Sequence, residues 1–98
     1  MQNKEATNMT VKEQLIAAKA LIDKPEKWCQ GNAIDAQGRI CASQALRTIT
    51  GGGLADAEYE ALADAMAGPG SLVCAWNDTH THAEVIAAFD RAIAAQRD

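Results

Sequence analysis

The chain has 98 residues, of which 48% are hydrophobic, and its formal net charge is −4. This length accommodates one domain, because domains usually contain about 100–150 residues. No stretch approaches the roughly 18 consecutive apolar residues of a membrane-spanning helix, and the polar start of the chain does not resemble a signal peptide. The three cysteines lack the paired spacing of a disulfide framework, which favours a reducing compartment. We therefore expect a soluble, cytoplasmic protein.

The charge is distributed unevenly along the chain. Residues 1–47 contain seven basic and five acidic residues, whereas residues 48–98 contain two basic and eight acidic residues. An acidic surface repels phosphate backbones and attracts basic surfaces. The second half therefore argues against direct nucleic-acid binding and favours a protein partner with a basic surface. The alternative interpretation is a solvated acidic face that maintains solubility.

The first residues, 1–9, are polar and show no periodicity, so we expect a flexible tail ahead of a single helical domain at residues 10–98. Thr10 and Glu13 have the spacing of a capping box, in which each side chain accepts from the backbone N–H of the other residue. Apolar residues then recur at helical spacing until Pro25, which cannot continue a helix. This pattern predicts the first helix.

The segment after the first helix contains Trp28-Cys29-Gln30-Gly31 and then a turn signal at residues 35–38. The sequence of that signal is Asp-Ala-Gln-Gly, in which the aspartate bonds to nearby backbone and the glycine tolerates a positive φ. Short apolar pairs flank the turn. We therefore expect a small β-hairpin or an irregular insertion, because an isolated two-stranded ribbon is marginal unless it packs on helices.

Two further helices are expected in the middle of the chain. Helical spacing of apolar residues starts again at Cys41 and stops at three consecutive glycines from Gly51. The next helix is expected at residues 56–67, with its apolar residues inward and its acids outward, and residues 68–70 (Gly-Pro-Gly) end it.

The last third of the chain predicts one short helix and one long helix. Residues 71–76 are apolar, and periodicity does not distinguish a strand from a helix over so short a run. We expect a helix capped by Ser71, because its helical neighbours offer no partner strand. Thr81 and Glu84 repeat the capping-box spacing and open a helix that ends near Arg97. The whole pattern predicts a mostly α single domain of four to five helices, with the first and last helices as central neighbours.

Both tryptophans lie beside residues that form corners. A buried indole contributes much apolar contact, and its N–H usually finds a hydrogen-bond partner. Asparagine and aspartate side chains bond to nearby backbone and favour turns. We therefore interpret the two tryptophan stretches as structural corners of the fold, formed by Trp28, Gln30, Gly31, Trp76 and Asn77.

The order of these motifs is similar to that of a family of short bacterial and bacteriophage proteins of unknown function. The similarity comprises residues 28–31, Asp35 with Gly38-Arg39, residues 41–46, residues 76–78 and the final helix. It covers residues 10–95. The resemblance implies one compact domain with a corner at each tryptophan, and it implies no reaction. Relatives often have Gly-Ala-Leu where this chain has Gln-Ala-Leu at 44–46, and the two histidines do not belong to the motif.

A cysteine-dependent hydrolase is one alternative function. It requires a thiolate, a nearby imidazole and a group that orients the imidazole. Cys29 with His80 and Asp78 supplies these residue types, and His82 and Asn77 are substitutes for the last two. The local signatures of known cysteine proteases are absent, and the chain is short for a substrate cleft. A small ligand-binding domain centred on Cys29 and residues 76–78 is the related alternative.

A metal site would require ligands from both halves of the chain. Three cysteines and two histidines are present, but they do not have the CxxC or HExxH spacing of common zinc sites. The five residues are Cys29, Cys41, Cys74, His80 and His82. We therefore expect no metal and no other cofactor.

The favoured function is that of a small acidic, non-enzymatic interaction protein. The interval 48–90 contains no lysine or arginine, and a one-sided acidic face suits an inhibitor that binds a basic surface of a bacterial defence or nucleic-acid-handling complex. Such an inhibitor would be encoded by a phage or a mobile element. A thin, alanine-rich core also makes homodimerisation an open alternative. The expected protein-binding residues are Asp56, Glu58, Glu60, Asp64 and Asp78.

Overall fold

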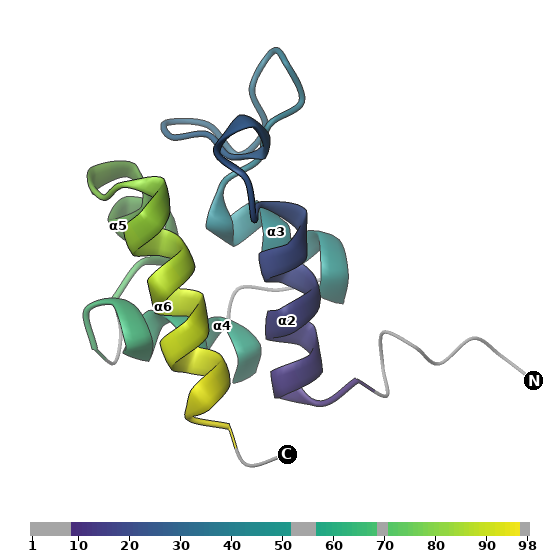
Figure 1. The fold of residues 1–98 in the computed structure, drawn as a ribbon, viewed down its shortest axis with the longest axis vertical. Coiled ribbons are helices and arrows are strands. Elements are labelled where there is room, and N and C mark those ends of the chain that lie inside the picture. Colours follow the sequence, from purple (N-terminus) through teal and green to yellow (C-terminus); the bar gives the residue numbers. More distant parts are fainter. Residues whose placement is uncertain (1–8, 52–56, 69–70, 97–98) are drawn as a thin grey trace, which may run out of the picture.

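Five α-helices and one short 3-10 helix form the fold in the computed structural model, which describes residues 9–51, 57–68 and 71–96 (Figure 1). Within these ranges, no helix is long and apolar enough to cross a membrane. The mostly α-helical prediction is confirmed. The predicted tail, apart from Met9, lies outside the described residues. The elements are α2 (Val11–Leu21), η1 (Pro25–Lys27), α3 (Ala42–Thr50), α4 (Ala57–Met66), α5 (Val73–Thr79) and α6 (His82–Ala94).

Capping boxes begin the first and last helices of the described chain, as the sequence predicts. In α2, Thr10 Oγ1 accepts from Glu13 N–H at 3.0 Å, and Glu13 Oε1 accepts from Thr10 N–H at 2.9 Å. In α6, Thr81 and Glu84 form the same reciprocal pair at 3.1 and 2.8 Å. Each box satisfies backbone donors that have no partner inside the helix.

One apolar core joins the helices. The helix α2 packs against α3, α4 and α6, so the predicted contact between the first and last helices is present. An ion pair between Lys19 and Asp90, 2.6 Å long, crosses from α2 to α6 at the surface. Phe89 is the largest fully buried side chain. The other large apolar side chains of this core that are fully buried are Leu15, Ile22, Leu46, Leu62, Val73 and Val85.

Two helix boundaries differ from the prediction. The helix α5 starts at Val73, and its N-cap is Leu72, which forms no side-chain capping bond. Ser71, the predicted cap, instead donates from Oγ to the carbonyl of Ala63 in α4 at 2.8 Å. The helix α6 ends at Ala94, short of the predicted end near residue 97, which lies outside the described residues.

Of the two structures predicted after the first helix, the irregular insertion forms, at residues 28–41 (the upper end of Figure 1), and the β-hairpin is not supported. The turn itself is present: Gly38 N–H donates to the carbonyl of Asp35 at 3.0 Å. Ile40 forms one antiparallel bridge with Ile34 and one parallel bridge with Trp28. The antiparallel pairing stops at Cys41, because this residue is the N-cap of α3: its N–H donates to the carbonyl of Ala33, but its own carbonyl accepts from Ala45 N–H. Ile40 N–H donates to the carbonyl of Lys27. In the described ranges of the chain there is consequently no sheet.

The acids of α4 do not all point outward. Glu58 is 4% exposed, so the prediction that it lies on the acidic surface is wrong. Tyr59, the next residue, is also buried, and its hydroxyl accepts from Val73 N–H at 3.2 Å. Glu60 and Asp64 are exposed as predicted. Asp56, the fourth predicted acid of this helix, lies outside the described residues.

Candidate functional site

Asn77 joins the two tryptophan stretches. Its side chain is fully buried, and its Oδ1 accepts from Trp28 Nε1 at 2.6 Å and from Ala42 N–H at 3.0 Å. Its Nδ2 donates to the carbonyl of Cys29 at 3.1 Å and to Asp78 Oδ1 at 3.1 Å. One amide therefore ties α5 to the insertion and to the start of α3. We call this set of contacts the Asn77 junction.

Gln30 and Gly31 add to the Asn77 junction. Gln30 Nε2 donates to the carbonyls of Asn77 and His80 at 3.1 and 2.7 Å. Gly31 N–H donates to Asp78 Oδ1 at 2.8 Å. Gly31 has a φ of 83°, a backbone conformation that is strained in residues with a side chain. Asp78, a predicted protein-binding residue, thus holds the backbone of the insertion with one carboxylate oxygen.

Trp76 contacts the core and lies against His80. The two rings are stacked, with centroids 3.5 Å apart and planes 10° from parallel. His80 Nδ1 forms a hydrogen bond with the Trp76 carbonyl at 2.8 Å, which fixes the imidazole on the indole. The structure therefore places four of the five predicted corner residues, Trp28, Gln30, Gly31 and Asn77, at the contact between the insertion and α5. Trp76 lies in α5 against the core and His80.

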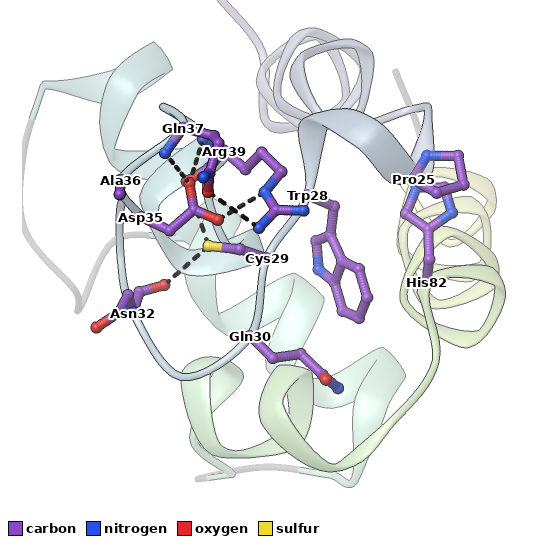
Figure 2. A pocket seen from close by; sticks show the side chains of 10 residues that line it. All are labelled: Pro25, Trp28, Cys29, Gln30, Asn32, Asp35, Ala36, Gln37, Arg39 and His82. Atoms are coloured by element: carbon purple, nitrogen blue, oxygen red, sulfur yellow. Dashed lines mark hydrogen bonds and ion pairs between the residues drawn. The ribbon is translucent and has the colours of Figure 1, made fainter.

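An open pocket of about 630 Å³ lies beside Trp28 and Cys29 (Figure 2). Cys29 is 6% exposed, and its thiol donates to the carbonyls of Asn32 and Arg39 at 3.3 and 3.2 Å. Burial raises the pKa of the Cys29 thiol, and the negative charge of Asp35 nearby raises it further. The thiol is therefore protonated at neutral pH, the form that is a poor nucleophile.

The three residues of the hydrolase hypothesis form hydrogen bonds with backbone groups and not with one another. The Cys29 thiol points to two backbone carbonyls, His80 Nδ1 bonds to the Trp76 carbonyl, and Asp78 Oδ1 accepts from Gly31. A nucleophilic cysteine needs its base within hydrogen-bond distance of the sulfur and an orienting group on that base. The observed bonds serve the local fold instead.

Asp35 and Arg39 also line the pocket beside Trp28 and Cys29, which we call the Cys29 pocket. Asp35 Oδ1 accepts from the backbone N–H groups of Gln37 and Arg39, both at 2.9 Å, and Oδ2 accepts from Arg39 Nε at 2.6 Å. Partial burial acts to raise the pKa of Asp35, but the hydrogen bonds from Arg39 and Gln37 and the charge of Arg39 outweigh it and lower the pKa. This ion pair was not predicted from the sequence, although an aspartate and an arginine stand four residues apart around the turn glycine.

His82 lies on the other side of Trp28. The ring centroids are 5.5 Å apart, and His82 Nε2 forms a 2.7 Å hydrogen bond with the carbonyl of Ile22 at the end of α2. In the described part of the chain, no three histidine, cysteine or acidic side chains are grouped closely enough to hold a metal ion. Of the cysteines, Cys74 is exposed, whereas Cys29 and Cys41 are buried.

A second hollow, of about 660 Å³, lies between α4 and α6. Glu60 and Asp64 stand one helical turn apart on α4 and line it, together with Arg91 of α6. We call this hollow the α4–α6 groove. Its small apolar lining consists of Ala57, Ala61, Ala65, Ala92 and Ala95.

The carboxylates of the α4–α6 groove are available to a partner. Neither Glu60 nor Asp64 forms a salt bridge or a side-chain hydrogen bond with another described residue. Arg91, the nearby cation, donates from Nε and Nη2 to the carbonyl of Ala65 at 3.1 and 2.6 Å. Its guanidinium is therefore held at the C-terminal end of α4, where a cation is favourable.

The family comparison covers both regions. The model of DUF6197, described as a family of unknown function, matches residues 6–95. Comparison with curated proteins and with solved structures found no match. The matched range includes the Asn77 junction as well as the α4–α6 groove, and its description names no activity.

Proposed function

Because the chain belongs to DUF6197, a family of unknown function, we propose its function from its surfaces. It is a non-enzymatic interaction protein of the cytoplasm that binds a basic surface of another protein through the α4–α6 groove. The observation that carries the proposal is the pair of exposed carboxylates, Glu60 and Asp64, which have no ion pair among the described residues.

The shape of the α4–α6 groove supports this function. Five alanines line it, so a partner helix or extended segment can approach the backbone of α4 and α6 closely. Lysine or arginine side chains on that segment would then face Glu60 and Asp64. Rim charges of this kind accelerate association and select partners more than they add affinity. The interaction should therefore weaken as the salt concentration rises.

The class of partner follows from the sign of the charge. Proteins that handle nucleic acids carry exposed basic surfaces, because they neutralise phosphates. An inhibitor encoded by a phage or a mobile element would cover such a surface of a bacterial defence complex with its own acidic groove. The same acidic groove would repel nucleic acid itself.

Small-ligand binding in the Cys29 pocket is the second candidate function. The pocket presents the Trp28 indole, the guanidinium of Arg39 and the Gln30 side chain to solvent (Figure 2). A ligand there would change the fluorescence of Trp28. Catalysis by Cys29 additionally requires a reactive thiol, so slow labelling of Cys29 by iodoacetamide in the folded protein, at the rate of global unfolding, would reject a hydrolase.

Affinity capture with charge variants tests the proposed function. The tagged chain is used to capture host proteins, and the same experiment is repeated with Glu60→Lys/Asp64→Lys and with Glu26→Lys. Glu26 is an exposed acid of η1, outside the α4–α6 groove, so Glu26→Lys controls for a change in net charge. Each variant is first checked for an unchanged melting temperature.

The expected result is a basic protein that the unmodified chain and Glu26→Lys recover and that the double variant loses. A single Glu60→Lys variant should lose part of the recovery, and it is the direct match to Glu26→Lys. Equal recovery of every captured protein by all variants would contradict binding through the α4–α6 groove.

A further inference from the structure

A third hollow, of about 360 Å³, lies where the insertion meets α3 and α5. Leu72 at the start of α5 borders it and is 61% exposed, the largest exposed fraction among the exposed large apolar side chains of the described residues. The exposed thiol of Cys74 and the buried Tyr59 also line it. We call this surface the Leu72 hollow. It combines a protruding apolar side chain with a recess beside it.

Opposite charges lie in the same hollow. Arg47 of α3 and Asp78 of α5 both line it. Arg47 is exposed and forms no salt bridge with any residue in the described ranges. Asp78 uses Oδ1 for Gly31 and Asn77, and no described residue donates to its Oδ2. Each charge can therefore accept a partner of opposite sign.

We propose that the Leu72 hollow binds a second copy of this chain in a two-fold symmetric dimer. A two-fold interface uses the same patch on both copies, so the patch must complement itself. The Leu72 hollow meets this condition in two ways. Leu72 of each copy fills the recess of the other, and Arg47 of each copy pairs with Asp78 of the other.

The overall charge of the protein favours a dimer through the Leu72 hollow over a dimer through the α4–α6 groove. Two copies with a net charge of −4 repel each other, so a contact surface that carries both signs of charge is more favourable than an acidic one. The Leu72 hollow carries one cation and one anion, whereas the α4–α6 groove carries two anions and one cation that is bonded to a backbone carbonyl. The dimer would leave Glu60 and Asp64, which line a different hollow, accessible to a basic partner.

Sedimentation equilibrium of three proteins tests the dimer. The unmodified chain is compared with Leu72→Asp and with Ile16→Asp, a control on α2 that is also an exposed apolar residue (48% exposed) outside the Leu72 hollow. We expect Leu72→Asp to raise the dimer dissociation constant about 100-fold. Each copy loses an apolar side chain from the interface, and the two new aspartates repel each other. Ile16→Asp should leave the constant unchanged.

We also expect the Leu72→Asp variant to fold. Leu72 occupies the N-cap of α5 with extended backbone and no capping bond. Aspartate is among the best N-cap residues, so the variant should keep or raise the stability of the monomer. Loss of the dimer with a well-folded monomer is then a specific result.

Cross-linking at Cys74 gives an independent measurement. The Cys74 thiols of a two-fold dimer lie in the shared interface region, and Cys29 and Cys41 are buried. At one protein concentration, a short bis-maleimide should therefore yield a covalent dimer with the unmodified chain and with Ile16→Asp, and much less of it with Leu72→Asp. Arg47→Glu should reduce the yield, because it removes both Arg47–Asp78 pairs. A monomer up to about 1 mM, or a dimer that Leu72→Asp leaves intact, would overturn the proposal.

Discussion

The Asn77 junction and the α4–α6 groove use polar side chains in opposite ways. At the junction, a fully buried amide forms four hydrogen bonds to the insertion, α3 and its own helix. In the groove, Glu60 and Asp64 are exposed, and their side chains form no hydrogen bond or ion pair with another described residue. Polar groups that are satisfied inside the protein stabilise the fold, whereas charges that face solvent remain available to another molecule.

This difference separates the residues that hold the insertion on the helices from those proposed to bind. The hydrogen-bonded Trp28 N–H and the buried Asn77 amide constrain the residues around them closely. The acids of the groove stand out only as a charge pattern. Substitutions should therefore divide into those that unfold the protein and those that leave it folded but unable to bind.

The largest effect on stability is expected for Asn77→Ala. The substitution leaves Trp28 Nε1–H, Ala42 N–H and the Cys29 carbonyl without their buried partner. Each lost partner costs about 1–3 kcal/mol, so the free energy of unfolding should fall by about 3–5 kcal/mol. Urea denaturation followed by circular dichroism measures the change. A loss below about 1 kcal/mol would show that the junction does not hold the insertion.

Trp28→Phe should have an intermediate effect. It keeps most of the apolar contact but removes the N–H that donates to Asn77 Oδ1, which then retains the bond from Ala42. We expect the free energy of unfolding to fall by about 1–2 kcal/mol. The same denaturation experiment applies, with fluorescence of the remaining Trp76 as the signal. A decrease as large as that of Asn77→Ala would assign the energy to indole packing instead of the hydrogen bond.

Thr81→Ala removes the capping box of α6 and should destabilise the protein by about 1 kcal/mol. Thr10→Ala removes the equivalent box of α2 and is the matched comparison, since both boxes have the same bonds. Thermal melts monitored by circular dichroism measure both variants. Melting temperatures that do not change in either variant would contradict the role of the boxes.

The α6 capping box should also make stability depend on pH. The hydrogen bond from Thr81 N–H to the Glu84 carboxylate lowers the pKa of Glu84 in the folded protein below its ordinary value. A lowered folded pKa contributes stability above the unfolded pKa, and this contribution is lost as the pH falls through the folded pKa. The stability difference between the unmodified chain and Glu84→Gln should therefore shrink as the pH falls through the lowered folded pKa of Glu84. A difference that stays constant with pH would contradict this assignment.

The smallest effect on stability is expected in the α4–α6 groove. Glu60→Gln/Asp64→Asn removes two exposed charges at constant shape, and the free energy of unfolding should change by no more than about 0.5 kcal/mol. Binding of a basic partner should nevertheless weaken clearly and lose most of its dependence on salt. Isothermal titration at two salt concentrations measures this. A large loss of stability would show that these carboxylates stabilise the fold and would contradict their role as a binding surface.

Local patterns predicted much of the fold, and tertiary contacts decided the rest. The capping boxes at Thr10 and Thr81 mark both long helices, because their bonds lie within three residues of each other. The sequence left a hairpin and an irregular insertion open after the first helix, and the irregular insertion forms, in which Ile40 also pairs with Trp28, a contact that no local pattern reveals. Glu58 was placed at the surface by its charge, but the packing of α4 buries it. The α4–α6 groove could not be predicted, since it depends on how two helices far apart in the sequence pack.

Backbone chemical shifts during a titration with a lysine-rich helical peptide test the central claim most directly. The peptide presents lysines one helical turn apart, and a matched glutamate-rich peptide is the control. We predict salt-sensitive shifts at Glu60, Asp64 and the facing part of α6, and none at Gln30 or Asp35. Shifts confined to the Cys29 pocket, or equal shifts with the acidic peptide, would contradict binding of a basic partner in the α4–α6 groove.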